Sequence, residues 1–193
     1  MIRMATEADL PRILEIYAPY VLNTTISFEY EVPTPDAFTQ RFLRITEQFP
    51  WLVWEDDGIV MGYAYASLPF SRPGYRWCAE PSIYLHPDAQ GKGIGRSLYA
   101  VLEQILTLQG YRHICSIVTG ENTGSLKFHE KTGYTVCGVL HGCGWKFGRN
   151  LDVFFLEKRT NLVEIPSNPP VSCRSIVKND RIFLDILATL SLS

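Results

Sequence analysis

The sequence predicts an α/β (α+β) fold in which a mixed sheet is covered by helices. Apolar residues recur at helical spacing in some segments and at strand spacing in others, and the two kinds alternate along the chain. Short turn signals separate them, such as Asp57-Gly58, a dipeptide typical of a tight hairpin. In order, the segments give β-α-α-β-β-β-α-β-α-β-β, the pattern of a mixed sheet with helices packed on it.

The first half of the chain is expected to start with a short strand, Ile2-Arg3-Met4, followed by a helix. Thr6 is the expected N-cap of that helix, with Asp9 as its acidic partner. A second helix is expected to begin at Thr34-Pro35, where a capping residue precedes a proline. Strands at residues 51–55 and 59–68 then flank the hairpin turn.

The second half is expected to continue with a strand at residues 77–85, and a glycine-rich turn that leads into a long amphipathic helix ending at Gly110. The remaining elements are a strand at 112–119, a short helix at 122–131 closed by Gly133, and final strands at 134–140 and 151–157.

Residues 1–160 are expected to form one domain. Beyond Thr160 the character of the sequence changes, because Pro166, Pro169 and Pro170 mark a linker. The pattern of residues 179–192 favours a short amphipathic helix. We therefore interpret residues 161–193 as a C-terminal extension and not as a second domain.

The composition excludes several classes of protein. The chain has 193 residues and a net charge of −2, which suits one domain and favours neither a nucleic-acid partner nor a membrane surface. It shows no long apolar run and no leader pattern. Five cysteines without a CxxC pair favour reduced thiols in the cytoplasm. Cys137, His141 and Cys143 lie close together, but no second ligand pair has the spacing of a structural zinc site, so we expect no metal.

The most informative motif lies between a predicted strand and the long helix, and reads Gln90-Gly91-Lys92-Gly93-Ile94-Gly95-Arg96. Alternating glycines allow backbone amides to point to one place without obstruction by a Cβ atom. The N-terminus of the helix, together with Lys92 and Arg96, adds positive charge. The motif predicts a cradle for a diphosphate, although it is neither a Walker loop nor a dinucleotide fingerprint. The alternative is a plain tight turn before a helix.

These residues resemble the GCN5-related N-acetyltransferase (GNAT) superfamily, whose pyrophosphate loop reads Q/R-x-x-G-x-G/A at this junction. Gln90, Gly93 and Gly95 fill its fixed positions. Asn122 and the stretch from His129 to Tyr134 resemble the second signature, an asparagine followed by a YEKxGF-like helix end. The resemblance covers the chain up to residue 159. It implies a mostly antiparallel sheet that is splayed between strands 4 and 5, and acetyl-CoA as the co-substrate.

Within that superfamily the chain most resembles the phosphinothricin and methionine sulfoximine acetyltransferases. Four further segments carry this similarity: Thr25-Ile26-Ser27-Phe28, Phe49-Pro50-Trp51-Leu52-Val53, Tyr75-Arg76-Trp77-Cys78-Ala79-Glu80 and Gly144-Trp145-Lys146-Phe147-Gly148-Arg149. The resemblance implies a small amino-acid-like acceptor and a homodimer.

Glu80 and His129 are the candidate catalytic residues. Glu80 lies in an otherwise apolar strand, where burial raises the pKa of a carboxyl group toward the value that a general base for an ammonium substrate needs. The alternative is a glutamate at a strand edge that faces solvent, but the catalytic glutamate of the phosphinothricin enzymes matches this position. His129 stands where the superfamily usually has a tyrosine that protonates the leaving thiolate, and the phosphinothricin group also has histidine there. An imidazole can act as acid or base near neutral pH, and a structural histidine is the alternative.

The resemblance also assigns the binding residues. The pantetheine arm is expected to contact Ile83, Tyr84 and Leu85, near which a backbone amide would hold the carbonyl oxygen. The pyrophosphate is expected at Gln90, Gly91, Lys92, Gly93, Ile94, Gly95 and Arg96, and a more distal part of the cofactor at Asn122. On the acceptor side, Arg72 offers a fork that suits a carboxylate or a phosphinate, with Tyr75 beside it and Phe28 as an apolar wall.

We therefore expect an N-acetyltransferase that moves the acetyl group of acetyl-CoA to the amino group of a small amino-acid-like substrate with general-base assistance. One alternative is the same chemistry on a polyamine, a drug or a protein N-terminus, although the basic loop 71–76 disfavours a polyamine. The other alternative is a catalytically silent CoA-binding module. The presence of both Glu80 and His129 disfavours it, because binding CoA requires neither.

Overall fold

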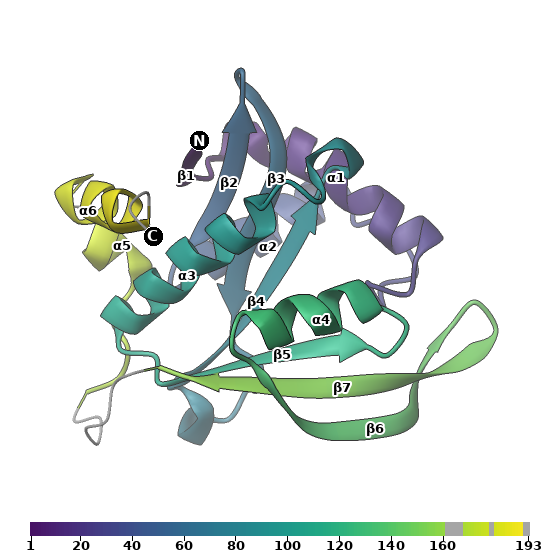
Figure 1. The fold of residues 1–193 in the computed structure, drawn as a ribbon. Helices are drawn as coiled ribbons and strands as arrows, with labels where there is room; N and C mark the ends of the chain where they lie inside the picture. The colour runs from purple at the N-terminus through teal and green to yellow at the C-terminus, as the bar shows by residue number, and fades with distance from the viewer. Residues whose placement is uncertain (161–167, 178–179, 191–193) are drawn as a thin grey trace.

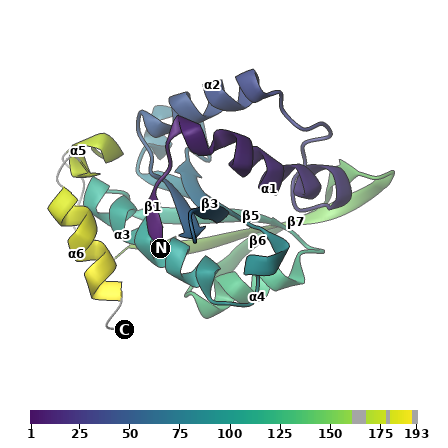
Figure 2. The ribbon, with the colours of Figure 1, turned by 90° about the horizontal axis from the view of Figure 1, so that it is seen from above.

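The computed structural model of the chain describes residues 1–160, 168–177 and 180–190. These residues form a seven-stranded sheet in the order β1-β2-β3-β4-β5-β7-β6, with helices on both of its faces (Figures 1 and 2). Neighbouring strands are antiparallel except for β4 and β5, which are parallel. The predicted α/β fold with a mixed, mostly antiparallel sheet is confirmed.

The elements follow one another as the sequence predicts, with shifts at their ends. In chain order they are β1 (Ile2–Met4), η1 (Glu7–Asp9), α1 (Leu10–Asn23), α2 (Pro35–Thr46), β2 (Trp51–Asp56), β3 (Ile59–Ser67), η2 (Pro73–Tyr75), β4 (Cys78–Leu85), η3 (Pro87–Ala89), α3 (Ile94–Gln109), β5 (His113–Thr119), α4 (Thr123–Lys131), β6 (Thr135–Lys146), β7 (Arg149–Arg159), α5 (Cys173–Val177) and α6 (Asp180–Leu190).

The capping residues act largely as the sequence predicts. The Thr34 hydroxyl accepts a hydrogen bond from the backbone amide of Ala37 at 3.2 Å, and the proline at residue 35 opens α2. Asp57 and Gly58 have φ angles of 47° and 78°, the left-handed values that a tight hairpin turn requires. Gly110 ends α3 with a φ of 98°.

The hairpin of β6 and β7 is longer than the sequence predicts. β6 continues to Lys146 and not only to residue 140, and β7 begins at Arg149, so that Phe147 and Gly148 form the tip with φ angles of 52° and 74°. The predicted ends were too short because glycines interrupt the apolar alternation of this segment. Register shifts between Leu140 and Gly144 accommodate the interruption without ending the pairing.

Two apolar layers hold the helices on the sheet. α3 packs on one face through fully buried side chains that include Leu98, Leu102 and Ile105. α1 and α2 pack on the other face around Trp51, whose ring stacks on that of Tyr65 with centroids 4.2 Å apart. Figure 2 shows α1 and α2 together on one side of the sheet and α3 and α4 on the other. None of the described helices is both long and apolar enough to span a membrane.

The described part of the C-terminal extension packs against α3. Cys173 and Ile186 are 1% and 6% exposed and belong to the same apolar layer as that helix. The side-chain amide of Gln109, at the end of α3, donates to the carbonyl oxygens of Gln48 and Val171 at 2.7 and 2.8 Å. Pro166 of the expected linker, together with residues 179 and 191–192 of the expected helix, lies outside the described residues.

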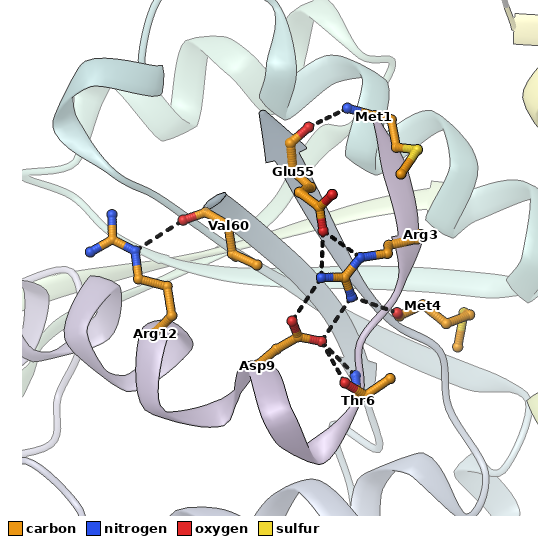
Figure 3. Close-up of polar contacts among 8 residues, drawn as sticks. All are labelled: Met1, Arg3, Met4, Thr6, Asp9, Arg12, Glu55 and Val60. Carbon is orange, nitrogen blue, oxygen red and sulfur yellow. Dashed lines mark hydrogen bonds and ion pairs between the residues drawn. The ribbon is translucent and has the colours of Figure 1, made fainter. Parts of the chain in front are cut away.

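A network of charged residues joins the N-terminal strand to β2 and to the start of α1 (Figure 3). The Arg3 guanidinium donates two hydrogen bonds of 2.8 Å to the Asp9 carboxylate and one of 2.8 Å to Glu55. Asp9 also accepts the backbone amide of Thr6 at 2.7 Å. Hydrogen bonding to Arg3 is the main reason why the pKa of Asp9 is lowered from 3.8 to about 2.

Replacing Asp9 by asparagine should therefore lower the free energy of unfolding by about 2 kcal/mol at neutral pH, because the charged carboxylate is the form that the fold stabilises. The pKa is lower in the folded state, so this contribution is complete above about pH 4 and is lost as the pH falls toward 2. Urea unfolding at several pH values measures this contribution to the free energy of unfolding. It compares the wild type with Asp9→Asn and with the control Glu7→Gln, at an exposed site. Equal losses in the two variants would contradict the role of Asp9.

Candidate active site

The site lies where β4 and β5 separate. The two strands pair only through Cys78 with His113 and Ala79 with Ile114, whereas β4 stays paired with β3 as far as Leu85. Pro81, two residues beyond the last pair, has no N–H group to donate to a neighbouring strand. The predicted splay between strands 4 and 5 is thus present, and it opens the middle of the sheet into a fork (Figure 1).

Three adjoining cavities run through this fork. A groove of about 380 Å³ lies on the side of α3 and α4, and a pocket of about 330 Å³ lies on the side of the loop between α1 and α2. A narrower cavity connects them: it shares Ile83, Asn122 and Ser125 with the groove and shares Glu80 with the pocket. Ile26 lines all three. A ligand in the groove and a ligand in the pocket could therefore meet at the narrow cavity.

Glu80 lies at the junction of the narrow cavity and the pocket. Among the described residues, no hydrogen bond or ion pair to its carboxylate is present. Burial without a partner disfavours the charged form and raises the pKa of Glu80 from 4.5 to about 7. The carboxylate can consequently change its protonation state near neutral pH, at the point where the narrow cavity meets the pocket.

His129 lines the same narrow cavity, and its side chain is almost completely buried. Its Nδ1 lies 2.8 Å from the carbonyl oxygen of Ser125, which can only accept a hydrogen bond, so Nδ1 carries the proton. In the neutral ring Nε2 is then the acceptor for the Tyr99 hydroxyl, 3.1 Å away. Burial lowers the pKa of His129, which favours this neutral form.

The glycine-rich turn forms the end of the groove next to α3. Gly91 and Gly93 have φ angles of 73° and 80°, which side chains disfavour, and Gly93 immediately precedes the first residue of α3. Gln90, Gly91 and Gly95 line the groove. Lys92 and Arg96 are exposed, whereas the side chain of Ile94 is buried in the core and leaves only its backbone for a ligand. The free amides at the start of α3 point a partial positive charge at this end.

Other predicted cofactor residues divide between the two faces of the sheet. Ile83 and Leu85 line the groove, whereas the Tyr84 ring packs on the face of α1 against Tyr17, with centroids 4.8 Å apart, and lines the pocket. Asn122 lines the groove and also caps α4, where its side-chain oxygen accepts the amide of Ser125 at 3.1 Å.

Sequence reasoning missed two polar groups that line the cavities of the fork. The Tyr20 hydroxyl donates to the carbonyl oxygen of Leu85 and lies 3.1 Å from the side-chain nitrogen of Gln90, at the wall of the groove. The buried hydroxyl of Thr119 has no hydrogen-bond partner among the described residues and lines both the narrow cavity and the pocket. Both residues lie within apolar periodic segments, where the sequence carries no signal for a polar role.

The predicted acceptor residues do not all meet. Phe28 lines the pocket together with Glu29 and Glu80. Arg72 immediately precedes η2 and Tyr75 is its last residue, and both are exposed to solvent. The Tyr75 ring packs on Phe70 with centroids 4.8 Å apart. Neither lines the three cavities of the fork. Among the described residues, no group of three or more histidine, cysteine, aspartate or glutamate side chains is arranged to hold a metal ion.

Comparison with known proteins agrees with this geometry. Residues 2–155 match the family model described as "Acetyltransferase (GNAT) domain". The chain is 33% identical over 168 residues to phosphinothricin N-acetyltransferase from Streptomyces viridochromogenes, covering 87% of this chain and 90% of that protein. It is 35% identical to the L-methionine sulfoximine/L-methionine sulfone acetyltransferase of Salmonella typhimurium, with 81% and 92% covered.

A solved structure of a protein with a bound ligand has the same fold. The phosphinothricin acetyltransferase of Sinorhizobium meliloti, in complex with AcCoA, matches with a TM-score of 0.81 at 37% identity, covering 89% of this chain and 92% of that one. The chain therefore belongs to the GNAT family of acetyltransferases. Within that family it is an N-acetyltransferase that depends on acetyl-CoA.

Proposed function

We propose that the enzyme acetylates the amino group of a small amino-acid-like acceptor of the phosphinothricin or methionine sulfoximine/sulfone type. The observation that carries the proposal is the position of Glu80, between a groove that suits acetyl-CoA and a pocket of about 330 Å³ that suits an amino acid. The names of the two relatives, whose sequences are 33% and 35% identical to this one, support the acceptor class.

Glu80 is proposed to act as the general base. The amine of an amino acid is largely protonated at neutral pH and must lose a proton before it can attack the thioester. A carboxylate with a pKa of about 7 accepts this proton far better than an exposed glutamate would. Glu80 passes this proton to solvent, and the neutral amine attacks the carbonyl carbon of acetyl-CoA directly. The nitrogen then gives its second proton to Glu80 as the C–S bond breaks and the amide forms.

His129 is proposed to serve the leaving thiolate through Tyr99. The proton on Nδ1 is fixed by the Ser125 carbonyl, so Nε2 orients the Tyr99 hydroxyl. Both side chains line the narrow cavity through which the pantetheine sulfur would reach the acceptor. The Tyr99 hydroxyl would turn from Nε2 to donate a hydrogen bond to the departing thiolate. Burial raises the pKa of Tyr99, so the tyrosine would keep its proton and the thiolate would take one from solvent.

The groove is proposed to hold acetyl-CoA. The glycine-rich turn and the start of α3 offer amides to the pyrophosphate, and Ile83 and Leu85 offer an apolar wall to the pantetheine arm. The unpaired edge of β4 beyond Ala79 is available to hydrogen-bond the amides of that arm and the thioester oxygen.

We further propose that the enzyme is a cytoplasmic homodimer. Support for self-association comes from the β6–β7 hairpin, which exposes apolar side chains that include Val136, Leu140 and Trp145, each more than half exposed. Sedimentation velocity would measure a single species at the monomer mass if this part of the proposal is wrong.

A thiol-release assay with acetyl-CoA tests the proposed reaction. The panel contains phosphinothricin, methionine sulfoximine, methionine sulfone, the common amino acids, spermidine and a short peptide. We expect turnover with the methionine-like compounds and with phosphinothricin. Turnover confined to spermidine or to the peptide would retain the reaction but contradict the acceptor class. CoA binding without turnover on any amine would indicate a silent binding module.

Glu80→Gln should lower kcat by about a hundredfold or more at pH 7, because glutamine cannot accept the proton. In the wild type, kcat/KM should rise with pH through an inflection near 7, since Glu80 is protonated and inactive as a base below it. The variant should lose this inflection, bind CoA normally and lose least activity at high pH, where the free amine is more abundant. Glu130→Gln, at an exposed site on α4, is the control. An undiminished rate for Glu80→Gln would remove Glu80 from the mechanism.

Gly93→Val should weaken CoA binding by about tenfold or more, because a side chain at this position both strains the backbone and occupies the space in front of the amides. Gly58→Val is a matched control, because the φ angle is 78° at Gly58 and 80° at Gly93. At either position a Cβ atom meets no residue other than its chain neighbours within 4 Å. Both variants should lose stability, but only Gly93→Val should lose CoA affinity in calorimetric titration. Equal CoA affinities would contradict the proposed placement of the pyrophosphate.

A further inference from the structure

The outer wall of the acceptor pocket is a loop without strand pairing. The connection between α1 and α2 lines this pocket through Ile26, Ser27, Phe28 and Glu29. Residues of β4 and β5 line it as well. The described backbone hydrogen bonds join none of these four residues to the sheet. Something other than the β-ladder must therefore fix this wall, which the proposed function requires to hold an amino acid.

Lys146, near the end of β6, holds the loop from below the surface. Its side chain is only 2% exposed, and its ammonium group donates to the carbonyl oxygens of Val21, at 2.7 Å, and Ser27. No carboxylate forms an ion pair with it among the described residues, and burial lowers its pKa. Val21 lies in the last turn of α1, so the cation also satisfies a carbonyl at the C-terminal end of that helix.

Two further contacts connect the same loop to the same hairpin. The Tyr30 hydroxyl donates to the carbonyl oxygen of Trp145 at 2.8 Å. The Thr25 hydroxyl donates to the Glu121 carboxylate at 3.0 Å, and Arg149 at the start of β7 donates to both oxygens of that carboxylate. The loop is thus attached to the β6–β7 hairpin on both sides of Phe28.

Gly144 is where the hairpin meets the Phe28 ring. A Cβ atom on Gly144 would lie 2.5 Å from Cζ and 2.6 Å from Cε2 of Phe28, far inside van der Waals contact. The φ angle of Gly144 is not in the left-handed region, so the backbone itself does not require glycine here. The absence of a side chain is what lets the ring lie against β6 while it lines the pocket.

We propose that Gly144 is a specificity-determining position of the acceptor pocket, because it sets where the Phe28 ring stands across from Glu80, and that Lys146 is the positioning residue that holds the loop there. The inference rests on the proposed function, since it assigns the pocket to the acceptor. Neither residue lines the groove that suits acetyl-CoA.

Gly144→Ala is the direct test, with Gly138→Ala as its control. Gly138 lies in the same strand, and a Cβ atom there meets nothing within 4 Å. Gly144→Ala should raise KM and Kd for methionine sulfone by about tenfold, the effect expected when an apolar wall shifts by about a methyl group, and leave the KM for acetyl-CoA unchanged. Gly138→Ala should match the wild type in all of these values.

The double variant Phe28→Leu/Gly144→Ala separates the proposal from general damage to the fold. Leucine lacks the two ring atoms that the new methyl group would meet, so Gly144→Ala should have almost no further effect on acceptor Kd in the Phe28→Leu background. An equal loss in both backgrounds, or a Gly144→Ala enzyme that resembles Gly138→Ala, would overturn the inference.

Calorimetric Kd values for acceptor added to the CoA-bound enzyme keep this test separate from the proposed function. Wild-type enzyme that binds and acetylates methionine sulfone, with no change in Gly144→Ala, contradicts only the inference. Wild-type enzyme that neither binds nor acetylates any amino acid contradicts the proposed function and the inference together. Lys146→Met, like Gly144→Ala, should raise the Kd for the acceptor and leave the KM for acetyl-CoA unchanged.

Discussion

The short pairing between β4 and β5 is the constraint on which the rest of the structure depends. Two paired positions hold the halves of the sheet together at Cys78 and Ala79, and beyond them the strands diverge. The divergence leaves a polar backbone edge and one carboxylate in the interior of the protein, where neither is stable without a partner. In the proposed function a bound thioester and an amine supply such partners, so the feature that weakens the sheet would also create the active site.

In the proposed function, the elements around the fork each serve one of the two ligands. α3 and α4 bring the glycine-rich turn, Asn122 and His129 to the cofactor side, whereas the loop after α1 brings Phe28 to the acceptor side. The β6–β7 hairpin lies outside both groups but contacts the loop that carries Phe28 through Lys146 and Gly144. The chain thus keeps a rigid cofactor side, built on helices and strands, and a separately supported acceptor side, in which substrate preference can change without loss of CoA binding.

Local signals made most of the fold predictable, and distant contacts explain what was missed. Thr34-Pro35, Asp57-Gly58 and Gly110 act through their own backbone geometry, so their roles are readable from a few neighbouring residues. Glu80 and His129 were also predicted together as candidate catalytic residues, and in the structure both line one cavity. The bond between Tyr99 and His129, the support of Phe28 by Gly144 and the docking of the extension on α3 join segments far apart in the chain, for which periodicity holds no information. Arg72 shows the converse: its residue type suits an anion, but its loop lies outside the three cavities of the fork.

We propose that the fork keeps Glu80 ready to exchange a proton near neutral pH. A titration of side-chain carboxyl carbons by ¹³C NMR, with the Glu80 resonance assigned by its absence in Glu80→Gln, measures this directly and requires no substrate. We expect a midpoint near pH 7 in the free enzyme, well above the 4.5 of an ordinary glutamate. A midpoint close to 4.5 would mean that water solvates the carboxylate freely, and it would contradict the role of Glu80 as the general base.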